Sequence, residues 1–356
     1  MRKAVLIINT HTEYLATQAE KLGYKTFCID GFNQNNLNKI SRQNFLKKFI
    51  KKIQKDYKSI KLIYGSGLED KPHTYKILDS EVDVQGNSFE MLEHCNDILK
   101  LEKALNISGL HIPKTSFRPL DRTIKTIVKP LQGFGGLHIS FASKNNKNNY
   151  YQEFIPGQTF SISFFRNKKK FFFLGFNQLF TLKEFPTSPF IHAGAMNISR
   201  IKKSTKIKKS IEIFSSLIDL QGYNTIDFKI YKNKVFVIDI NPRITSTFRI
   251  YNELYANDLL KSQINLKNGG MKVNYPKLKK FYGFIHMFSR SNFTFYNKIQ
   301  GDSSITNLPL EGEFIKKDSP VFTINFLSDS PSKVIKSLKK RISMTRKYFN
   351  CYDIDI

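Results

Sequence analysis

The chain has 356 residues, 40% of them hydrophobic, and a formal net charge of +28 at pH 7. A chain of this length exceeds the usual size of a single core, so we expect two or three domains. Its longest apolar runs, such as Phe171–Phe176, are far too short to span a bilayer, and we expect no signal peptide. The composition therefore predicts a globular protein with no membrane partner.

The cysteine residues and the net charge indicate the cellular compartment and the kind of partner. Three widely spaced cysteines predict a reducing, cytoplasmic compartment and exclude a cysteine-type zinc site. The positive charge raises one alternative, a basic protein that binds nucleic acid through phosphate contacts. Most of the 57 basic residues are Lys. The Lys clusters are scattered along the chain, and their spacing indicates solvent-exposed helix faces. We therefore expect weak attraction for anionic substrates rather than nucleic-acid binding as the main role.

The first part of the chain, residues 1 to about 92, alternates strands with helices. The expected elements are strands at Ala4–Ile8, Lys25–Ile29 and Ile60–Tyr64, with helices at 14–22 and about 42–55. This alternation predicts a parallel sheet. Gly65-Ser66-Gly67 follows the third strand beside Glu69 and Asp70, and is either a ligand-binding loop or a plain tight turn. A helix is then expected from Met91 to Asn106.

The next motif is a glycine-rich turn between two strands. The strand Thr126–Pro130 carries Lys129 near its end, and a second strand is expected at 137–141. Between them, Gly133, Gly135 and Gly136 form a turn whose backbone N–H groups could close over phosphates, with the Lys129 ammonium directed at the same anion. The alternative is a tight turn without a ligand. The P-loop signature does not fit, because no helix follows and the lysine precedes the glycines.

A strand that breaks at Pro-Gly comes next. Residues 150–157 end in Pro156-Gly157, and a further strand is expected at 158–165. Unpaired backbone groups at such a break can meet an adenine edge, and Glu153 can accept from the adenine amino group. A plain hairpin is the alternative.

The most informative motif is a predicted hairpin that carries two aspartates. A helix from about 203 to 220 precedes it, Asp227 lies on its first strand, and Lys232-Asn233 forms the turn. Asp239 and Asn241 follow on the second strand, so two carboxylates and a carboxamide converge as a hard-oxygen site suited to Mg²⁺. A solvated hairpin end with an ordinary Asn-Pro turn is the alternative.

The remaining residues predict a mixed region. A helix is expected from about 249 to 260, short strands dominate 283–326, and a basic helix spans about 332–348.

Four motifs follow one another along the chain in an order that resembles the ATP-grasp superfamily. They are Lys-Pro with a glycine loop, Gln-Glu-Phe-Ile-Pro-Gly, a single Asp, and Asp-Ile-Asn-Pro-Arg. The order is most similar to the predicted ATP-dependent carboligases related to biotin carboxylase. The resemblance implies an α/β fold of the α+β grasp type, with a Rossmann-like pre-grasp domain (1–92) and a two-lobed ATP-grasp domain (93–265). The small lobe would span about 124–180 and the large lobe about 190–265. A C-terminal region, 266–356, would pack on the grasp domain.

The resemblance also implies a role for each candidate site residue. These are Lys129 at the ATP phosphates; Gly133, Gly135 and Gly136 in a flexible lid; Gln152, Glu153, Phe154 and Ile155 at the adenine hinge; Asp227, Asp239 and Asn241 on Mg²⁺ or Mn²⁺; and Arg243 facing the transferred phosphoryl group. Two positions depart from the family pattern. Many relatives carry a nucleotide-binding Lys after an Asp, but Ile98 follows Asp97 here, so that contact is either absent or supplied from elsewhere, with Lys100 and Lys103 as the candidates. Asp239 stands where relatives often have Glu.

The activity implied is an ADP-forming carboxylate–amine ligase that uses ATP and Mg²⁺. A carboxylate would form an acyl-phosphate, and an amine or similar nucleophile would displace phosphate; the tyramine–glutamate ligase type is the nearest named activity. The alternatives are a carboxylase-like enzyme that phosphorylates bicarbonate and, in a different class, the basic nucleic-acid-binding protein. A homodimer stays open as the assembly. For His192, which lies in the region expected to receive the acyl acceptor, we favour a structural role.

Overall fold

The computed structural model describes residues 3–31, 39, 43–133, 135–136, 138–141, 149–168, 170–186, 188–256, 258–268, 280–296, 299 and 301–356. The chain divides into two compact units. Unit 1 comprises residues 1–113, 162–174 and 202–276, and unit 2 comprises residues 114–161, 175–201 and 277–356. Among the described residues, no helix combines the length and apolar character that crossing a membrane requires.

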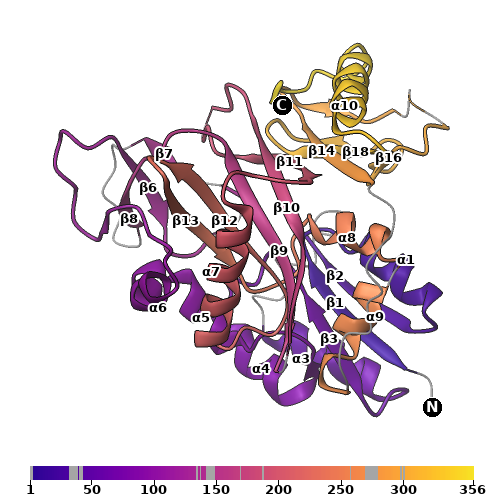
Figure 1. The fold of residues 1–356 in the computed structure, drawn as a ribbon. Coiled ribbons are helices and arrows are strands. Elements are labelled where there is room, and N and C mark those ends of the chain that lie inside the picture. The colour runs from indigo at the N-terminus through magenta and orange to yellow at the C-terminus, as the bar shows by residue number, and fades with distance from the viewer. Residues whose placement is uncertain are drawn as a thin grey trace. The chain divides into compact units, whose positions relative to one another are not determined.

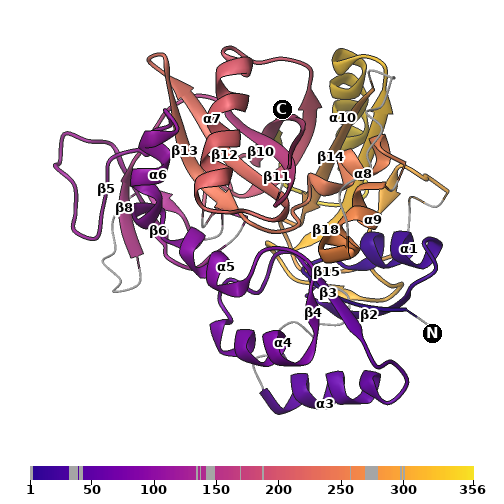
Figure 2. The same ribbon diagram turned by 60° about the horizontal axis from the view of Figure 1, so that its bottom comes forward.

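Unit 1 begins with a parallel sheet, as the alternation of strands and helices predicts. Its strand order is β2 (Lys25–Asp30), β1 (Ala4–Asn9), β3 (Ile60–Tyr64) and β4 (Asp83–Val84), and each neighbouring pair is parallel. Side chains on both faces of β1 are buried, because helices cover both faces. The helices α3 (Gln43–Gln54) and α4 (Tyr75–Glu81) lie on one side, and α1 (Glu13–Lys21) lies on the other (Figure 2).

The helix expected from Met91 to Asn106 is wrong as a single element. The chain forms α5 (Phe89–Asn96), a 3₁₀ turn η2 (Ile98–Leu101) and α6 (Glu102–Ile107) instead. The break lies at Asp97, whose backbone is extended and whose side chain accepts a hydrogen bond from the N–H of Leu99 at 3.2 Å. A short polar side chain that competes for backbone donors in this way ends one helix and caps the next.

The rest of unit 1 surrounds the predicted hairpin. The strands β12 (Gly222–Tyr231) and β13 (Lys234–Asn241) pair antiparallel, and β12 is flanked on its other edge by β9 (Thr159–Asn167) (Figure 1). The helix α7 (Ser204–Leu217) precedes the hairpin. The helix expected at 249–260 is two helices, α8 (Phe248–Leu254) and α9 (Asp258–Ile264), because Ala256 adopts a left-handed φ of 48° that ends α8. A short 3₁₀ turn, η3 (Leu266–Asn268), follows α9.

Unit 2 contains the glycine-rich motif in a small antiparallel sheet. Its strand order is β5 (Thr115–Ser116), β8 (Asn149–Glu153), β6 (Thr126–Pro130) and β7 (Ser140–Phe141). The pairing of β6 with β7 confirms two strands joined across the glycines, although the second strand is shorter than the expected 137–141.

Consecutive strands of the nine-stranded sheet that also contains β13, β12 and β9 supply the main core of unit 2. In order they are β10 (Lys170–Leu182), β11 (His192–Ile198), β14 (Phe281–Phe288), β18 (Pro320–Ser328) and β16 (Ile305–Thr306); β19 (Ile354–Asp355) pairs with β10. The first residues of β10 belong to unit 1. A separate pair is formed by β15 (Phe293–Thr294) and β17 (Phe314–Ile315).

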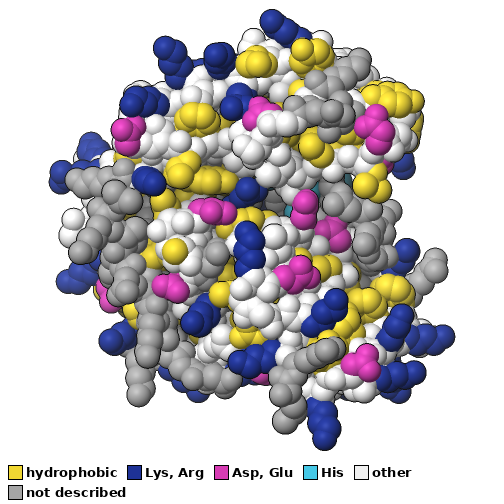
Figure 3. Space-filling model, turned by 90° about the vertical axis from the view of Figure 1, so that its right-hand side faces the viewer, with side chains coloured by type: hydrophobic (Ala, Val, Ile, Leu, Met, Phe, Trp, Pro, Cys, Tyr) yellow, Lys and Arg dark blue, Asp and Glu magenta, His cyan; other side chains and the backbone are white. Residues whose placement is uncertain are grey.

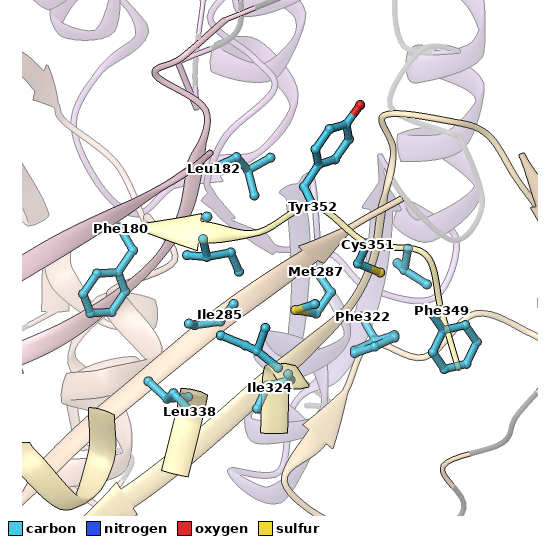
Figure 4. Packing of buried hydrophobic residues seen from close by; sticks show 14 of the residues in the cluster. Phe180, Leu182, Ile285, Met287, Phe322, Ile324, Leu338, Phe349, Cys351 and Tyr352 are labelled. Carbon is cyan, nitrogen blue, oxygen red and sulfur yellow. The ribbon is translucent and has the colours of Figure 1, made fainter. Parts of the chain in front are cut away.

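The core of unit 2 lies between this sheet and the helix α10 (Pro331–Thr345). Ile285 and Met287 from β14, Ile324 from β18 and Leu338 from α10 meet there, all buried (Figure 4). The apolar stripe of α10 faces the sheet and its lysines face solvent, which confirms the basic amphipathic helix that the sequence predicts.

Candidate functional site

The hairpin of unit 1 brings the two predicted metal-binding aspartates together. Lys232 and Asn233 form its two-residue turn with left-handed φ values of 44° and 63°, which suit a type I′ turn. Across the ladder Asp227 lies opposite Asp239. Residues that face each other on antiparallel strands project their side chains to the same side of the sheet, so both carboxylates share one face.

A β-bulge is what places Asp239 on that face. Phe228 pairs with Val237, whereas Asp227 pairs with Asp239, so Ile238 is an extra residue in β13. In a regular ladder Asp227 would face Ile238, and Asp239 would project to the other side of the sheet. The bulge lies directly beside the two carboxylates, where such features commonly redirect a side chain.

The donor set fits a hard divalent cation. Thr225 lies opposite Asn241, which puts Asn241 on the face of the two aspartates, and its Nδ2 donates to Asp239 Oδ2 at 3.2 Å. This leaves the amide oxygen of Asn241 and the carboxylate oxygens as donors of the kind Mg²⁺ takes. The described residues contain no group of three or more His, Cys, Asp or Glu that could hold a metal, so this site offers two carboxylates and one amide. Phosphate oxygens of a nucleotide would complete such a set.

Cys95 lies near this site but does not join it. Burial, and then the charge of Asp239, raise the pKa of the Cys95 thiol to about 12. The thiol therefore stays protonated near neutral pH and is a poor metal ligand.

Arg243 makes an ion pair that the sequence did not predict. Its guanidinium is buried, and its Nε pairs with the buried carboxylate of Glu69. Its Nη1 donates to Ser66 Oγ at 2.9 Å and to the carbonyl of Ile244 at 3.4 Å. The loop after β3 and the Asn-Pro-Arg segment are therefore joined at Arg243 within unit 1.

Further hydrogen bonds fix the same segment. The carbonyl of Pro242 accepts from Asn87 Nδ2 at 2.9 Å, and the N–H of Ile244 donates to the carbonyl of Tyr64 at 3.3 Å. The hydroxyl of Tyr64 donates to the carbonyl of Asn87 at 2.9 Å and lies 3.5 Å from that of Pro242. Burial raises the pKa of Tyr64, so its hydroxyl remains a donor throughout the physiological range. Arg243 is thus held on a loop with little freedom to move.

A buried hydroxyl cluster also adjoins the two aspartates, and sequence reasoning missed it. Tyr223 lies on the same face of β12 as Asp227, and its hydroxyl bonds Ser163 Oγ at 3.0 Å and Thr247 Oγ1 at 2.8 Å. Thr247 is also 2.9 Å from Thr245 Oγ1. Burial raises the pKa of Tyr223 to about 12, so it stays neutral. No spacing in the sequence signals this cluster, because its members come from separate segments.

In unit 2 the structure brings Lys129 and Gln152 together from two separate motifs. The pairing of β6 with β8 sets Ile127 opposite Gln152, and the Nζ of Lys129 lies 3.4 Å from Gln152 Oε1. Lys129 is buried, with its ammonium 5.8 Å from the centre of the Tyr150 ring. Gln152 Nε2 also donates to Thr115 Oγ1 at 3.0 Å. A buried ammonium in this position suits an anionic ligand.

The rest of the hinge segment makes internal contacts. The N–H of Glu153 donates to the carbonyl of Lys114 at 2.8 Å, and its carboxylate accepts from the N–H of Lys114 at 3.4 Å. The N–H of Phe154 donates to the carbonyl of Lys125 at 2.8 Å, and Ile155 is buried. The expected adenine contact of Glu153 stays a prediction. Because β8 and β9 belong to different sheets, the alternative of a plain hairpin is wrong.

The glycine turn is fixed at its carbonyls. The carbonyl of Gly135 accepts from the N–H of His192 at 2.9 Å, and that of Gly136 accepts from Ser188 Oγ at 2.8 Å. Gly136 has a left-handed φ of 79°, and a Cβ there would come within 1.9 Å of the carbonyl oxygen of Phe190, so only glycine fits. No hydrogen bond among the described residues uses the N–H groups of Gly133, Gly135 or Gly136.

Two remaining candidates have no ligand-binding geometry of their own. Burial lowers the pKa of His192 to about 4, and its ring centroid lies 6.2 Å from that of His286, so it packs as a neutral imidazole. Lys100 is exposed and its Nζ lies 3.9 Å from the carboxylate of Asp97. Whether the nucleotide-binding lysine is absent or is replaced by Lys100 or Lys103 stays a prediction.

Comparison with curated proteins finds relatives along most of the chain. An uncharacterised protein of Methanocaldococcus jannaschii is 23% identical over 352 residues, covering 90% of this chain and 87% of the relative. The tyramine–L-glutamate ligase of the same organism is 26% identical over 230 residues, covering 63% of this chain and 69% of that enzyme.

Solved structures share the fold at low identity. The biotin carboxylase domain of 2-oxoglutarate carboxylase from Hydrogenobacter thermophilus, solved as a dimer with MgADP and bicarbonate, matches with a TM-score of 0.73 at 11% identity. The match covers 98% of this chain and 90% of that one. The L-amino acid ligase from Bacillus licheniformis matches with a TM-score of 0.64 at 14% identity, over 96% and 98% of the two chains.

The family model for the ATP-grasp domain matches residues 95–247. This range contains Lys129, the glycine turn, the hinge segment, both aspartates and Arg243. The chain therefore carries an ATP-grasp domain over residues 95–247.

Proposed function

We propose that this protein is an ATP- and Mg²⁺-dependent ligase that joins a carboxylate to an amine and releases ADP and phosphate. The observation that carries the proposal is the pair of carboxylates, Asp227 and Asp239, held on one face of a hairpin within an ATP-grasp domain. The relatives named tyramine–L-glutamate ligase and the fold shared with an L-amino acid ligase support the same class.

The reaction follows from this class. An oxygen of the substrate carboxylate attacks the γ-phosphorus of ATP, the bond from that phosphorus to the β–γ bridging oxygen breaks, and ADP leaves. The amine nitrogen then attacks the acyl carbon, the bond from that carbon to the phosphate oxygen breaks, and the amine loses a proton. Such transfers depend on positioning and charge neutralisation rather than on a covalent protein group.

Each candidate residue takes one part of that work. Asp227, Asp239 and the amide oxygen of Asn241 would hold Mg²⁺, which when bound neutralises phosphate charge. Lys129 binds phosphate through a buried ammonium, where a charge acts more strongly than on the surface. Arg243 directs its guanidinium to the transferred phosphoryl group. The N–H groups of the glycine turn bind phosphate oxygens.

The substrates we propose are small molecules: an amino acid as the carboxylate, and an amine as the acceptor. The relatives that act on tyramine and L-glutamate make this pair the first to test. We further propose domain boundaries at about 92 and 265, and a homodimer, as in the biotin carboxylase domain of Hydrogenobacter thermophilus. A cytoplasmic location is in keeping with three free cysteines.

The nucleic-acid alternative requires a clustered positive face. On the face drawn in Figure 3, Lys and Arg side chains are dispersed, with Asp and Glu side chains among them. Dispersed charge of this kind attracts anions weakly, whereas binding to nucleic acid requires a continuous row of contacts to backbone phosphates.

The test is a screen of amino acids and amines for ADP release that requires both substrates, with mass spectrometry of the product. An amide product together with ADP supports the proposal. ATP turnover that yields AMP, or no ADP with any pair while the folded protein also fails to bind MgADP, contradicts it.

A further inference from the structure

We infer that Glu69, in the loop after β3, is a positioning residue for Arg243, and that this pair shapes the subsite for the transferred phosphoryl group. The inference rests on the proposed ligase function and adds to it. Glu69 lies outside residues 95–247, the range of the ATP-grasp family match. The loop Gly65–Glu69 would thus complete a site whose other residues lie far away in the sequence.

The first step is the burial of both charges. Arg243 is 6% exposed and Glu69 is 2% exposed. A buried charge is costly unless it is paired and its remaining polar atoms are hydrogen-bonded. Here Oε1 of Glu69 pairs with Nε of Arg243, and Oε2 accepts from the N–H of Gly67 at 2.6 Å. The backbone N–H of Gly67 therefore fixes the position of the Glu69 carboxylate, and this carboxylate can in turn fix the orientation of the Arg243 guanidinium.

The second step is the rigidity of the guanidinium. Its five N–H donors lie in one plane, so fixing two of its nitrogens also fixes the direction of the third. Glu69 holds Nε, while Ser66 Oγ and the carbonyl of Ile244 hold Nη1. Among the described residues, Nε has an ion pair and no assigned hydrogen bond, and Nη2 has neither assigned to it. The pair therefore presents one directed donor rather than a mobile cation.

The third step concerns charge. Because the Glu69 carboxylate offsets the positive charge of Arg243, the subsite attracts an anion through an oriented hydrogen bond more than through net charge. A preoriented donor of this kind costs little reorganisation when phosphoryl charge develops. A purely structural ion pair would instead contribute only to the stability of the loop, and its removal would not change anion binding in a folded protein.

The probe for this subsite is inorganic phosphate, titrated by calorimetry into the full-length protein saturated with MgADP. Four proteins are compared: wild type, Glu69→Gln, Ser66→Ala and Asp70→Asn. Glu69→Gln keeps the shape, but Gly67 N–H and Arg243 Nε face different oxygens of Glu69, and an amide has its oxygen in one of those two positions and an NH₂ donor in the other. Asp70→Asn is the matched control, because Asp70 is the next residue and pairs with Lys71 rather than Arg243. MgADP affinity and the thermal midpoint are measured for each.

We expect Glu69→Gln to bind phosphate about tenfold more weakly, as for one weakened charge-assisted hydrogen bond, with MgADP affinity and thermal midpoint near wild type. Ser66→Ala should show a smaller decrease, and Asp70→Asn none. Unchanged phosphate affinity in a folded Glu69→Gln would overturn the inference, and so would a wild-type MgADP complex that binds no phosphate. If Glu69→Gln does not fold, unchanged phosphate binding by Ser66→Ala overturns it. Failure of the wild type to bind MgADP would instead contradict the ligase proposal itself.

Discussion

Asp227 lies opposite Asp239 across the hairpin of unit 1 because a single extra residue, Ile238, shifts the ladder by one position. The tight turn pairs Tyr231 with Lys234, and a regular ladder from that pair would set Asp227 against Ile238. The bulge therefore converts two aspartates on opposite faces into a pair on one face. Bulges of this kind are typical beside active sites.

The first prediction concerns this pair. Asp239→Asn should reduce ADP formation by a factor of at least about a hundred, since the loss of a metal carboxylate removes several kcal/mol of transition-state stabilisation. Its side chain is exposed, so the fold should survive. The measurement is substrate-dependent ADP release beside circular dichroism.

Asp219→Asn is the control for that variant, because Asp219 is an aspartate of the same unit whose side chain bonds Gln221 instead. It should leave turnover unchanged. Near-normal turnover in Asp239→Asn would contradict the proposal that Asp239 binds Mg²⁺.

The second prediction separates two glycines of the turn. Both have a left-handed φ, but a Cβ at Gly136 would strike the carbonyl of Phe190, whereas a Cβ at Gly135 would meet nothing within 4 Å. Gly136→Ala should therefore raise the KM for ATP about tenfold more than Gly135→Ala, as strain of about 1–3 kcal/mol moves the turn. Steady-state kinetics of both variants decide this, and equal KM values would mean that the position of the turn is irrelevant to ATP.

The third prediction compares a buried lysine with surface lysines. Lys129→Ala should weaken ATP binding by about ten- to a hundredfold, because it removes a charge-assisted hydrogen bond to phosphate. Combined neutralisation of three exposed lysines on α10, Lys336, Lys339 and Lys340, should leave ATP binding unchanged. Titration with ATP and with an oligonucleotide at two salt concentrations measures both effects. A nucleic-acid-binding protein would give the reverse order, with a salt slope that falls by about one for each lysine–phosphate interaction removed.

The fourth prediction is a pH dependence of stability. Burial lowers the pKa of His192 to about 4, whereas in the unfolded chain it is about 6.5. Between these values the unfolded state binds a proton that the folded state does not, so the free energy of unfolding should fall as pH drops through this window. Urea unfolding at several pH values measures the slope.

His192→Gln should flatten that slope, and His73→Gln, which changes an exposed imidazole, should not. An identical slope in wild type and His192→Gln would show that His192 is not buried in its neutral form.

Local pattern predicted much of the fold. The parallel sheet of β1, β2 and β3, the tight turn at Lys232-Asn233 and the strands around the glycines follow from alternation and turn residues, which act over a few positions. The helix expected at 91–106 failed because the side chain of Asp97 competes for a backbone donor, an effect that apolar periodicity does not register.

The sequence names candidate residues for the site but not the contacts that they make. Asp227, Asp239 and Lys129 are readable from motifs, yet the bulge at Ile238 depends on the register of the whole hairpin. Counting residues from the turn reveals the bulge. With Tyr231 opposite Lys234, a regular ladder cannot place Asp227 opposite Asp239 unless one strand has an extra residue. The Glu69–Arg243 ion pair joins positions 174 residues apart (243 − 69), and no local signal links them. Tertiary packing alone reveals that pair.

The central claim is acyl-phosphate chemistry, and the fate of a carboxylate oxygen tests it most directly. The carboxylate identified in the substrate screen, labelled with ¹⁸O, is converted in the presence of ATP, Mg²⁺ and the amine, and the released phosphate is analysed by mass spectrometry. If the carboxylate attacks the γ-phosphorus, one ¹⁸O atom per amide formed appears in inorganic phosphate, and ADP carries none. Amide formation with unlabelled phosphate, or with the label in AMP, would contradict the account.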